Sequence, residues 1–280
     1  MRNTAPSNLF MSEAAYRKAP GINYSTLKHL RKSPLHYKHA VENPEDSGQD
    51  YAMLRHVHAL VLEPMSAHEQ SVVWDGRRDQ RNKEYAAFLE THKGKNILTV
   101  SEAAQAESIA AAYNGNGLVR WLLAISGTTC EVPLFCRQLV GDGVLALKGR
   151  PDIIHYSADH GLIVADLKTF GDTSAPLIAY AARKHGWLLQ LAHYTLLAAD
   201  LHEVDMLAVP LRWFTIVAED KAPWDATAIE WDGATKAGAL AEHQRLLEVL
   251  VDCQATGRWP GRGELQVATA VAGGVNDDQP

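Results

Sequence analysis

The sequence predicts a mixed α/β fold in which helices flank a central mixed β-sheet, preceded by a helical N-terminal elaboration. Helix-forming segments fill most of the first 124 residues, whereas strand-like apolar runs begin only at residue 129. From there the order is a hairpin, a strand, two helices and a further strand, which is typical of a sheet with helices packed on it. A chain of 280 residues is long enough to form one such domain around its own core.

The N-terminal half is predicted to be helical. Residues 1–20 are polar and are expected to be flexible, and Ser25 is suited to cap a helix that runs to about residue 42, interrupted at Pro34. A second helix over 51–62 ends before Pro64. The other predicted segments are loops at 43–49 and 74–82 and helices at 83–92 and 101–124, the last broken at 114–117.

The C-terminal half carries the strands. Gly141-Asp142-Gly143 is a hairpin signal between two apolar runs, so strands are predicted at 129–140 and 144–156. The following elements are a strand at 161–169, helices at 176–184 and 187–201, a strand at 206–217 and a closing helix at 234–255. We therefore expect a single domain over 21–263, with its core at about 129–218, and a C-terminal tail at 264–280.

Composition limits the class of protein. The hydrophobic fraction of 46% is that of an ordinary globular domain. The chain contains no run of eighteen apolar residues, and its first residues lack the apolar stretch of a signal peptide, so we expect a cytoplasmic protein without a membrane span. Cys130, Cys136 and Cys253 are an odd and sparse set that gives neither a disulfide framework nor a zinc-binding spacing.

Two short segments contain the candidate site. Asp152 follows Pro151, and Asp166-Leu167-Lys168 ends the next apolar run. Asp166 and Lys168 are two residues apart, so on a strand they share one face. A pair of carboxylates can hold a hard cation such as Mg²⁺, with the carbonyl oxygen of Leu167 as a further ligand, and a nearby lysine can orient a metal-bound water. This combination suits hydrolysis of a phosphodiester.

The pattern of Pro151-Asp152 and Asp166-Leu167-Lys168 resembles that of the PD-(D/E)XK nuclease superfamily. Within it, further segments resemble the phage-type exodeoxyribonuclease VIII (RecE) nucleases, although Arg262 stands where that family usually has Tyr. These segments are Tyr24 to Lys28 with Ser33 to Tyr37, the run His56 to Pro64, the pair Gln190 and Tyr194, and Trp259-Pro260-Gly261. The resemblance runs from about residue 20 to residue 263 and implies the α-β-β-β-α-β core of these nucleases.

The resemblance also implies roles for further side chains. His58 corresponds to a metal ligand, in preference to His56, although a histidine on an apolar helix is more often a core residue. Glu131 resembles the acidic residue of the first core strand, which holds a second metal or a metal-bound water; the alternative is an exposed strand residue. Gln190 and Tyr194 lie one helical turn apart and would face the site, unless their spacing reflects only ordinary amphipathicity.

Candidate DNA contacts come from two basic segments. The net charge of −6 argues against a protein that coats DNA, but a local basic path is available at Arg77, Arg78 and Arg81. Such a run is usually a solvated helix start, and the resemblance favours DNA binding instead. Ser25 and Lys28 are weaker candidates for a phosphate contact near the start of a helix.

The function that the resemblance implies is a Mg²⁺-dependent exonuclease, in which Mn²⁺ substitutes for Mg²⁺. It would digest double-stranded DNA ends from 5′ to 3′, leaving 3′ single strands for a single-strand annealing protein, as a homo-oligomeric ring in phage-type recombination in the bacterial cytoplasm. One alternative is a RecB-like or CRISPR-adaptation nuclease, which often carries an iron–sulfur cluster on four cysteines; with three cysteines we expect no cluster. The other is an inactive DNA-end-binding module, which the intact Asp152, Asp166 and Lys168 argue against.

Overall fold

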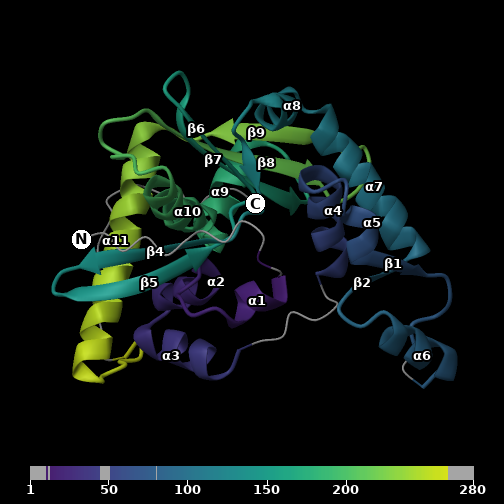
Figure 1. Cartoon of the computed structure of the whole chain (residues 1–280), viewed down its shortest axis with the longest axis horizontal. Helices are drawn as coiled ribbons and strands as arrows, with labels where there is room; N and C mark the ends of the chain where they lie inside the picture. The colour runs from purple at the N-terminus through teal and green to yellow at the C-terminus, as the bar shows by residue number, and fades with distance from the viewer. Residues whose placement is uncertain (1–10, 12, 45–50, 80, 264–280) are drawn as a thin grey trace, which may run out of the picture.

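A five-stranded mixed sheet lies at the centre of the molecule (Figure 1). In spatial order its strands are β3 (Thr129–Cys130), β6 (Ile153–Ser157), β7 (Gly161–Phe170), β8 (Leu211–Glu219) and β9 (Ala226–Glu230). β7 and β8 pair in parallel, whereas the other neighbouring strands are antiparallel, which confirms the predicted mixed sheet. The computed structural model describes residues 11, 13–44, 51–79 and 81–263.

The central strand β7 supplies both halves of the hydrophobic core. Leu162 and Val164 belong to one buried cluster, and Ile163 and Ala165 belong to another, because successive side chains of a strand point to opposite faces. All four side chains are fully buried. A strand that is covered on both faces is an almost continuous apolar run, which is why this segment is easily recognised in the sequence.

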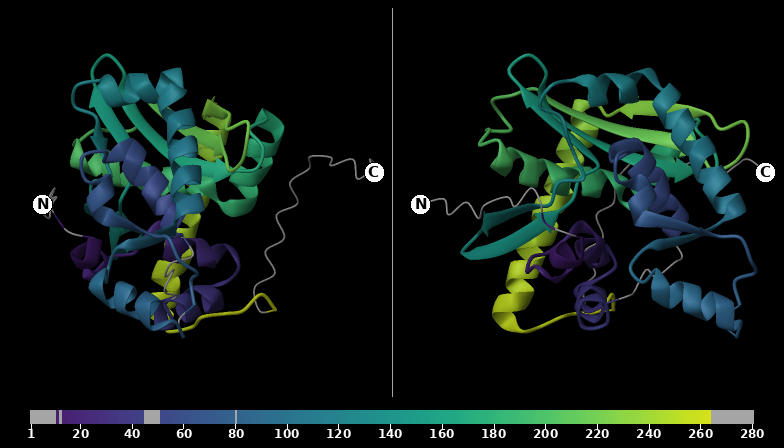
Figure 2. Two further views of the ribbon diagram at one scale, coloured as in Figure 1. Left: turned by 90° about the vertical axis from the view of Figure 1, so that its right-hand side faces the viewer. Right: turned by 45° about the vertical axis from the view of Figure 1, so that its right-hand side comes forward.

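Helices cover the two faces of the sheet from opposite sides (Figure 2). The face of Leu162 and Val164 is covered by α9 (Ala175–His185), α10 (Trp187–Leu201) and α11 (Gly233–Thr256). The face of Ile163 and Ala165 is covered by α4 (Ala52–Leu62), α7 (Val100–Gly115) and α8 (Gly117–Ala124). The site side chains can therefore approach the sheet from two separate helical layers.

A separate two-stranded antiparallel sheet, formed by β4 (Leu134–Val140) and β5 (Gly143–Gly149), packs against α10 and α11. The register of this hairpin continues without a shift into the pairing of β3 with β6. Residues 131–133 and 150–152 separate the two parts, and Pro133 and Pro151 within them cannot donate to a strand ladder. The predicted strands over 129–140 and 144–156 are thus each divided in two by a break in one long hairpin.

The N-terminal residues are anchored on this hairpin. Lys148 is 5% exposed, and its Nζ donates to the carbonyl oxygens of Tyr16, Arg17 and Ala19 at 3.1, 3.2 and 2.6 Å. These acceptors lie in and just after α1 (Glu13–Lys18). Because a buried ammonium requires hydrogen-bond acceptors, this segment is part of the folded domain, and the expectation of a flexible segment up to residue 20 is wrong here. The predicted tail at 264–280 lies outside the described residues.

The predicted helix over 25–42 is three short helices: α2 (Tyr24–Leu27), the 3₁₀ helix η1 (Lys28–Arg31) and α3 (Pro34–Glu42). Asn23 caps α2 in place of Ser25, since its side chain accepts from the Thr26 N–H. Ser33 caps α3, and Pro34 occupies the first turn, where a missing N–H costs nothing. The proline therefore starts a helix here rather than interrupting one.

Several short strands are missed by the sequence pattern. β1 (Ser71–Trp74) and β2 (Asn96–Thr99) pair in parallel, and α6 (Lys83–Thr91) lies between them in the sequence. The short helix α5 (Ala67–Gln70) immediately precedes β1. Four residues are too few to show a clear alternation. β9 is likewise absent from the prediction, and residues 206–210, predicted as strand, precede β8. Within the described residues, no helix is long and apolar enough to cross a membrane.

A buried histidine pair joins α10, α11 and β5. His193 Nε2 lies 2.9 Å from the Lys148 carbonyl oxygen, so this nitrogen carries the proton, and His193 Nδ1 accepts from His243 Nε2 at 3.0 Å. Burial lowers the pKa of His193 to about 4 and that of His243 to about 3. Both rings are therefore neutral in the folded protein at neutral pH.

Acid should destabilise the protein through this pair. The unfolded chain takes up protons on both rings below about pH 6.5, whereas the folded protein does so only near pH 4 and pH 3, so stability falls as the pH falls through this window. The loss is about 2 kcal/mol per histidine at pH 5. The free energy of unfolding, measured in urea at pH 7.5 and at pH 5, should fall less between these pH values in His243→Gln than in wild type. The control His39→Gln, on the exposed face of α3, should show the same fall as wild type. Equal losses in His243→Gln and wild type would contradict the assignment.

Candidate functional site

The break in the long hairpin places Glu131 and Asp152 beside each other. The Glu131 N–H donates to the carbonyl oxygens of Pro151 and Asp152 at 3.1 and 3.2 Å. Glu131 has a φ of 53°, in the left-handed region, where a residue other than glycine costs about 1–2 kcal/mol. The residue was predicted on a strand, and the structure places it at the point where the strand stops. Its side chain is 14% exposed, which does not fit an exposed strand residue.

Asp152 is held by the backbone of β7. Its Oδ2 accepts from the Leu167 N–H at 2.7 Å, and the residue is 6% exposed. The N–H and C=O of a strand residue point to the same side, so the Leu167 carbonyl oxygen also faces the side on which Asp152 lies. This orientation suits the predicted role of this carbonyl oxygen as a metal ligand.

Three side chains converge as a candidate metal centre. His58 of α4, Glu131 and Asp152 each offer one ligand atom, and these atoms lie within 4.8 Å of one another. His58 Nδ1 lies 3.7 Å from Glu131 Oε1 and 3.6 Å from Asp152 Oδ1. His56 packs instead near His68, with ring centroids 6.4 Å apart, so of the two histidines on α4 it is His58 that lies in the centre.

Asp166 and Lys168 complete the site from the next strand. As the i, i+2 spacing predicts, they share one face of β7, and the Lys168 ammonium contacts Asp166 Oδ2. Asp166 is 1% exposed; its Oδ2 contacts the Lys168 ammonium, whereas its Oδ1 has no donor among the described residues. A buried carboxylate oxygen that lacks a donor is what a divalent cation would satisfy, so the residues present fit a metal.

A hydrogen-bonded chain runs from Lys168 into α10. Lys168 Nζ donates to Gln190 Oε1 at 3.0 Å, and Gln190 Nε2 donates to the Tyr194 hydroxyl oxygen at 3.0 Å. Gln190 and Tyr194 are thus linked to each other and to Lys168 by hydrogen bonds. Tyr113 of α7 holds the same strand from the other helical layer, since its hydroxyl donates to the Lys168 carbonyl oxygen at 2.6 Å.

The charges at the site shift the pKa values of its members in opposite directions. Burial would lower the pKa of His58, but the carboxylates of Asp152 and Glu131 outweigh it and raise the pKa to about 10. Burial, together with the negative charge of Asp152, raises the pKa of Asp166 to about 6, against the opposing charge of Lys168. His58 is thus protonated among the carboxylates, and a cation that binds there must displace its proton.

Substitution of His58 should weaken metal binding. We expect His58→Gln to raise the Mg²⁺ concentration for half-maximal cleavage at least tenfold, since loss of even an outer-shell partner costs about 10–100-fold in metal affinity or activity. His56→Gln, two residues away and turned toward His68, should change this concentration much less. A Mg²⁺ titration of the cleavage rate measures both. Equal shifts in the two variants would mean that α4 as a whole matters, and not one ligand.

The predicted DNA contacts fall into two groups. Arg77 and Arg81 are exposed, with the Arg81 side chain 95% exposed and paired with Asp79. Arg78 is engaged within the protein, because its guanidinium binds the Glu102 carboxylate and donates to the Ile97 carbonyl oxygen at 2.6 Å. Arg78 thereby fixes the start of α7, so a contact with a DNA phosphate would compete with its bond to Glu102.

Ser25 and Lys28 do not form a helix N-terminal site. The Ser25 hydroxyl donates to Asn23 Oδ1 at 3.0 Å, and Asn23 already caps the four-residue helix α2. Lys28 is exposed in η1. Since α2 is a single turn and the Thr26 N–H already donates to Asn23, the start of this helix offers few donors to a phosphate.

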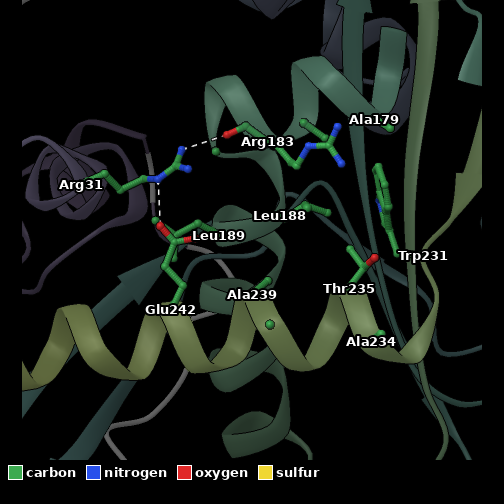
Figure 3. A pocket seen from close by; sticks show the side chains of 13 residues that line it. Arg31, Ala179, Arg183, Leu188, Leu189, Trp231, Ala234, Thr235, Ala239 and Glu242 are labelled. Atoms are coloured by element: carbon green, nitrogen blue, oxygen red, sulfur yellow. Dashed lines mark hydrogen bonds and ion pairs between the residues drawn. The ribbon is translucent and has the colours of Figure 1, made fainter. Parts of the chain in front are cut away.

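A cavity of about 350 Å³ lies away from these residues, between η1, α9 and α11. Figure 3 shows Arg31 bound to Glu242 at 2.9 Å and to the Arg183 carbonyl oxygen at 3.1 Å, beside small residues of α11 such as Ala234 and Ala239. None of the predicted catalytic or metal-binding residues lines this cavity. The chemistry of the carboxylate cluster, rather than the size of a cavity, therefore identifies the candidate site.

Two further residues were given no role from the sequence. Arg150 binds Glu131 of the cluster, and Glu63 in turn binds Arg150. Arg150 directly precedes Pro151-Asp152 but was given no role, since nothing in a linear pattern shows which carboxylate an arginine will contact. Its position immediately before Pro151-Asp152 was the available signal.

Comparisons with known proteins agree with this geometry. The region 23–269 matches the family described as "PDDEXK-like domain of unknown function (DUF3799)". No curated protein is significantly similar to the chain. The fold is similar to the crystal structure of a "putative exonuclease" from Eubacterium rectale, with 14% identity, a TM-score of 0.57, and coverage of 93% of this chain and 90% of that one. The crystal structure of SSO0001 is 19% identical over 71% of this chain and 85% of that one, but its TM-score of 0.29 supports no shared fold.

The family match includes both strand segments of the predicted motif as well as α10. The structural likeness to the Eubacterium rectale protein covers nearly the full length of both chains and supports the same fold. Since the matched region spans most of the sequence, the chain belongs to the family of PDDEXK-like domains and is a nuclease-type domain of the PD-(D/E)XK superfamily.

Proposed function

We propose that the protein is a divalent-metal-dependent deoxyribonuclease that hydrolyses the phosphodiester bonds of DNA. The observation that carries this proposal is the meeting of Asp166 and Lys168 on β7 beside the cluster of His58, Glu131 and Asp152. The carboxylate oxygens of this cluster suit Mg²⁺ and Mn²⁺. The resemblance to exodeoxyribonuclease VIII favours Mg²⁺, with Mn²⁺ as a substitute. A bound cation would polarise the phosphate and lower the pKa of a water molecule.

The protein's own residues would supply the remaining steps. His58, Glu131, Asp152 and Asp166 would hold the cation. The Lys168 ammonium would orient the attacking water and stabilise the negative charge of the phosphorane-like transition state. Gln190 and Tyr194 limit where this ammonium can lie, because Lys168 already donates to Gln190. The side chain is thus positioned before DNA arrives, which lowers the cost of ordering it in the transition state.

We propose further that the enzyme acts on double-stranded DNA ends as an exonuclease, from 5′ to 3′. The support is the resemblance of several segments to exodeoxyribonuclease VIII, which also suggests a ring-shaped homo-oligomer, a single-strand annealing protein as partner, a phage or prophage origin and a bacterial cytoplasmic setting. An enclosing ring would let a chain with a net charge of −6 stay on DNA without a large basic surface.

The test uses linear duplex DNA labelled at either the 5′ or the 3′ end, with closed circular DNA as a control. Release of the 5′ label first, a requirement for Mg²⁺ and resistance of the circle are the expected results. Efficient cutting of intact circles would contradict the exonuclease proposal, and release of the 3′ label first would contradict the polarity. A monomer in light scattering at the assay concentration would remove the ring while leaving the metal site unaffected.

The exposed arginines should set the salt dependence of DNA binding. In a plot of the logarithm of DNA affinity against the logarithm of salt concentration, each phosphate contact contributes about −0.9 to the slope. Replacing Arg77 and Arg81 together by Ala should therefore flatten the slope by roughly one to two units. Arg78→Ala is the internal control, because Arg78 binds Glu102 and should change the melting temperature rather than the slope. Binding in Ca²⁺ across a salt series measures both effects, and an unchanged slope in the double variant would place the DNA path elsewhere.

A further inference from the structure

Arg150 lies between the carboxylate cluster and the end of α4. Its Nε lies 2.8 Å from the Glu131 carbonyl oxygen and 2.9 Å from Glu131 Oε2. Its Nη2 lies 3.5 Å from Oε2 of Glu63, the residue that follows α4. One guanidinium therefore contacts both the backbone and the side chain of a candidate metal ligand, and also the helix that carries His58.

The two carboxylate oxygens of Glu131 consequently face different partners. Oε2 faces Arg150, whereas Oε1 lies 3.7 Å from His58 Nδ1 on the side of the metal centre. The backbone of Glu131 is in the left-handed region and requires support from its surroundings. That support comes from Arg150 at the Glu131 carbonyl and from the Pro151 and Asp152 carbonyls at its N–H.

We propose that Arg150 is a positioning residue for the metal centre: it holds Glu131 so that Oε1 alone is presented to the cation, and it couples this ligand to α4 through Glu63. This inference rests on the proposed metal-dependent function. A guanidinium suits the task because its donors are fixed in one plane, whereas a lysine ammonium is a single point on a flexible stem. Lysine would keep the charge but could not contact the Glu131 side chain, the Glu131 carbonyl and Glu63 in this arrangement.

A different role is open to an arginine at such a site, namely a direct contact with the DNA phosphate. The two roles make different predictions for the protein without DNA. A positioning residue changes the affinity for metal whether or not DNA is present, whereas a phosphate ligand changes only the affinity for DNA. The charge of Arg150 is a third contribution, since removal of a positive charge alone would strengthen cation binding. The variant Arg150→Lys keeps that charge and removes only the geometry.

The test measures Mn²⁺ binding to the DNA-free protein by electron paramagnetic resonance of the free ion. Arg150→Lys and Arg150→Gln should each weaken binding about tenfold or more, the range seen when outer-shell partners of metal ligands are replaced. Arg212→Lys is the matched control, because Arg212 binds Glu230 through Nε and Nη2 at 2.8 and 2.9 Å on the surface of β8. Its Mn²⁺ affinity should equal that of wild type.

A double-mutant cycle shows whether Arg150 acts through Glu131. Glu131→Gln should weaken Mn²⁺ binding, and adding Arg150→Lys to it should cause little further loss, because the residue to be positioned is already lost. Additive losses would overturn the proposal. So would unchanged Mn²⁺ affinity in Arg150→Lys with a raised KM for DNA, or tighter binding in Arg150→Gln with no change in Arg150→Lys.

The folding of each variant is checked by its melting temperature and circular dichroism. If the Arg150 variants do not fold, Glu63→Gln provides the second test, since it leaves Arg150 in place and removes the negative charge that Arg150 contacts at the end of α4. This variant should weaken Mn²⁺ binding in the same direction but by less than tenfold, and unchanged affinity would contradict the coupling. Failure of wild type to bind Mn²⁺ would instead contradict the metal site itself, so the two proposals fail in distinguishable ways.

Discussion

Asp166→Asn is expected to abolish DNA cleavage while leaving the fold intact. The carboxylate is 1% exposed; its Oδ2 lies against the Lys168 ammonium, and its Oδ1 has no donor among the described residues. Its loss removes a metal ligand without creating a cavity, since Asn has nearly the same volume. The reduction in rate should exceed the roughly 100-fold that replacement of an outer-shell residue can cause. Because burial and the charge of Asp152 together outweigh the attraction of Lys168 and raise the pKa of Asp166 to about 6, a neutral side chain at this position should let the metal-free protein melt at or above the wild-type temperature.

Cleavage of linear DNA in saturating Mg²⁺ and melting curves with and without Mn²⁺ measure these effects. Wild type should be stabilised by Mn²⁺ in proportion to its binding, and Asp166→Asn should show little of this stabilisation. Asp159→Asn is the matched control, because it makes the same change of charge at an exposed turn between β6 and β7. Substantial activity in Asp166→Asn would remove this residue from the site.

Lys168→Met should reduce the rate of the chemical step by about 10²–10³-fold, the range for loss of one donor that stabilises transition-state charge. Unlike Asp166→Asn, this variant should keep its affinity for Mn²⁺ or gain some, since a positive charge next to the cation is removed. Lys168→Arg should keep part of the rate. The positive charge of the side chain remains, but the guanidinium cannot occupy the position from which the Lys168 ammonium donates to Gln190.

Single-turnover cleavage with excess enzyme separates this effect from DNA binding. The expected signature is a slow chemical step with unchanged DNA affinity and unchanged or tighter Mn²⁺ binding. Gln190→Glu is a useful comparison, because a charged acceptor would bind the Lys168 ammonium more tightly and draw it toward α10. If Lys168→Met lost Mn²⁺ binding together with activity, the lysine would be supporting Asp166 rather than acting on the substrate.

The sequence predicted those parts of the site whose geometry is local. The i, i+2 spacing of Asp166 and Lys168 fixed their common face as soon as a strand was assigned, and the i, i+4 spacing did the same for Gln190 and Tyr194 on α10. The apolar run of β7 was recognisable because both its faces are buried. These inferences needed only one secondary-structure element at a time.

The parts that the sequence did not predict depend on contacts between distant segments. The left-handed backbone of Glu131 arises because the chain leaves one sheet for another, and Arg150 meets Glu131 only after the hairpin has bent there. The contact of Arg78 with Glu102 was not predicted, because no pattern reveals that an acceptor 24 residues along the chain lies beside it. His193 and His243 likewise approach each other only when α10 packs on α11.

The three carbonyl oxygens that surround the Lys148 ammonium also define where the domain begins. The family match starts at residue 23, yet Tyr16, Arg17 and Ala19 lie before that residue. A shortened protein that starts at the family boundary would strip a buried cation of these acceptors, on the same strand whose carbonyl receives the proton of His193. Truncations and N-terminal fusions of this enzyme should therefore keep the chain from Glu13 onward, and boundaries taken from sequence families can exclude residues that the folded core requires.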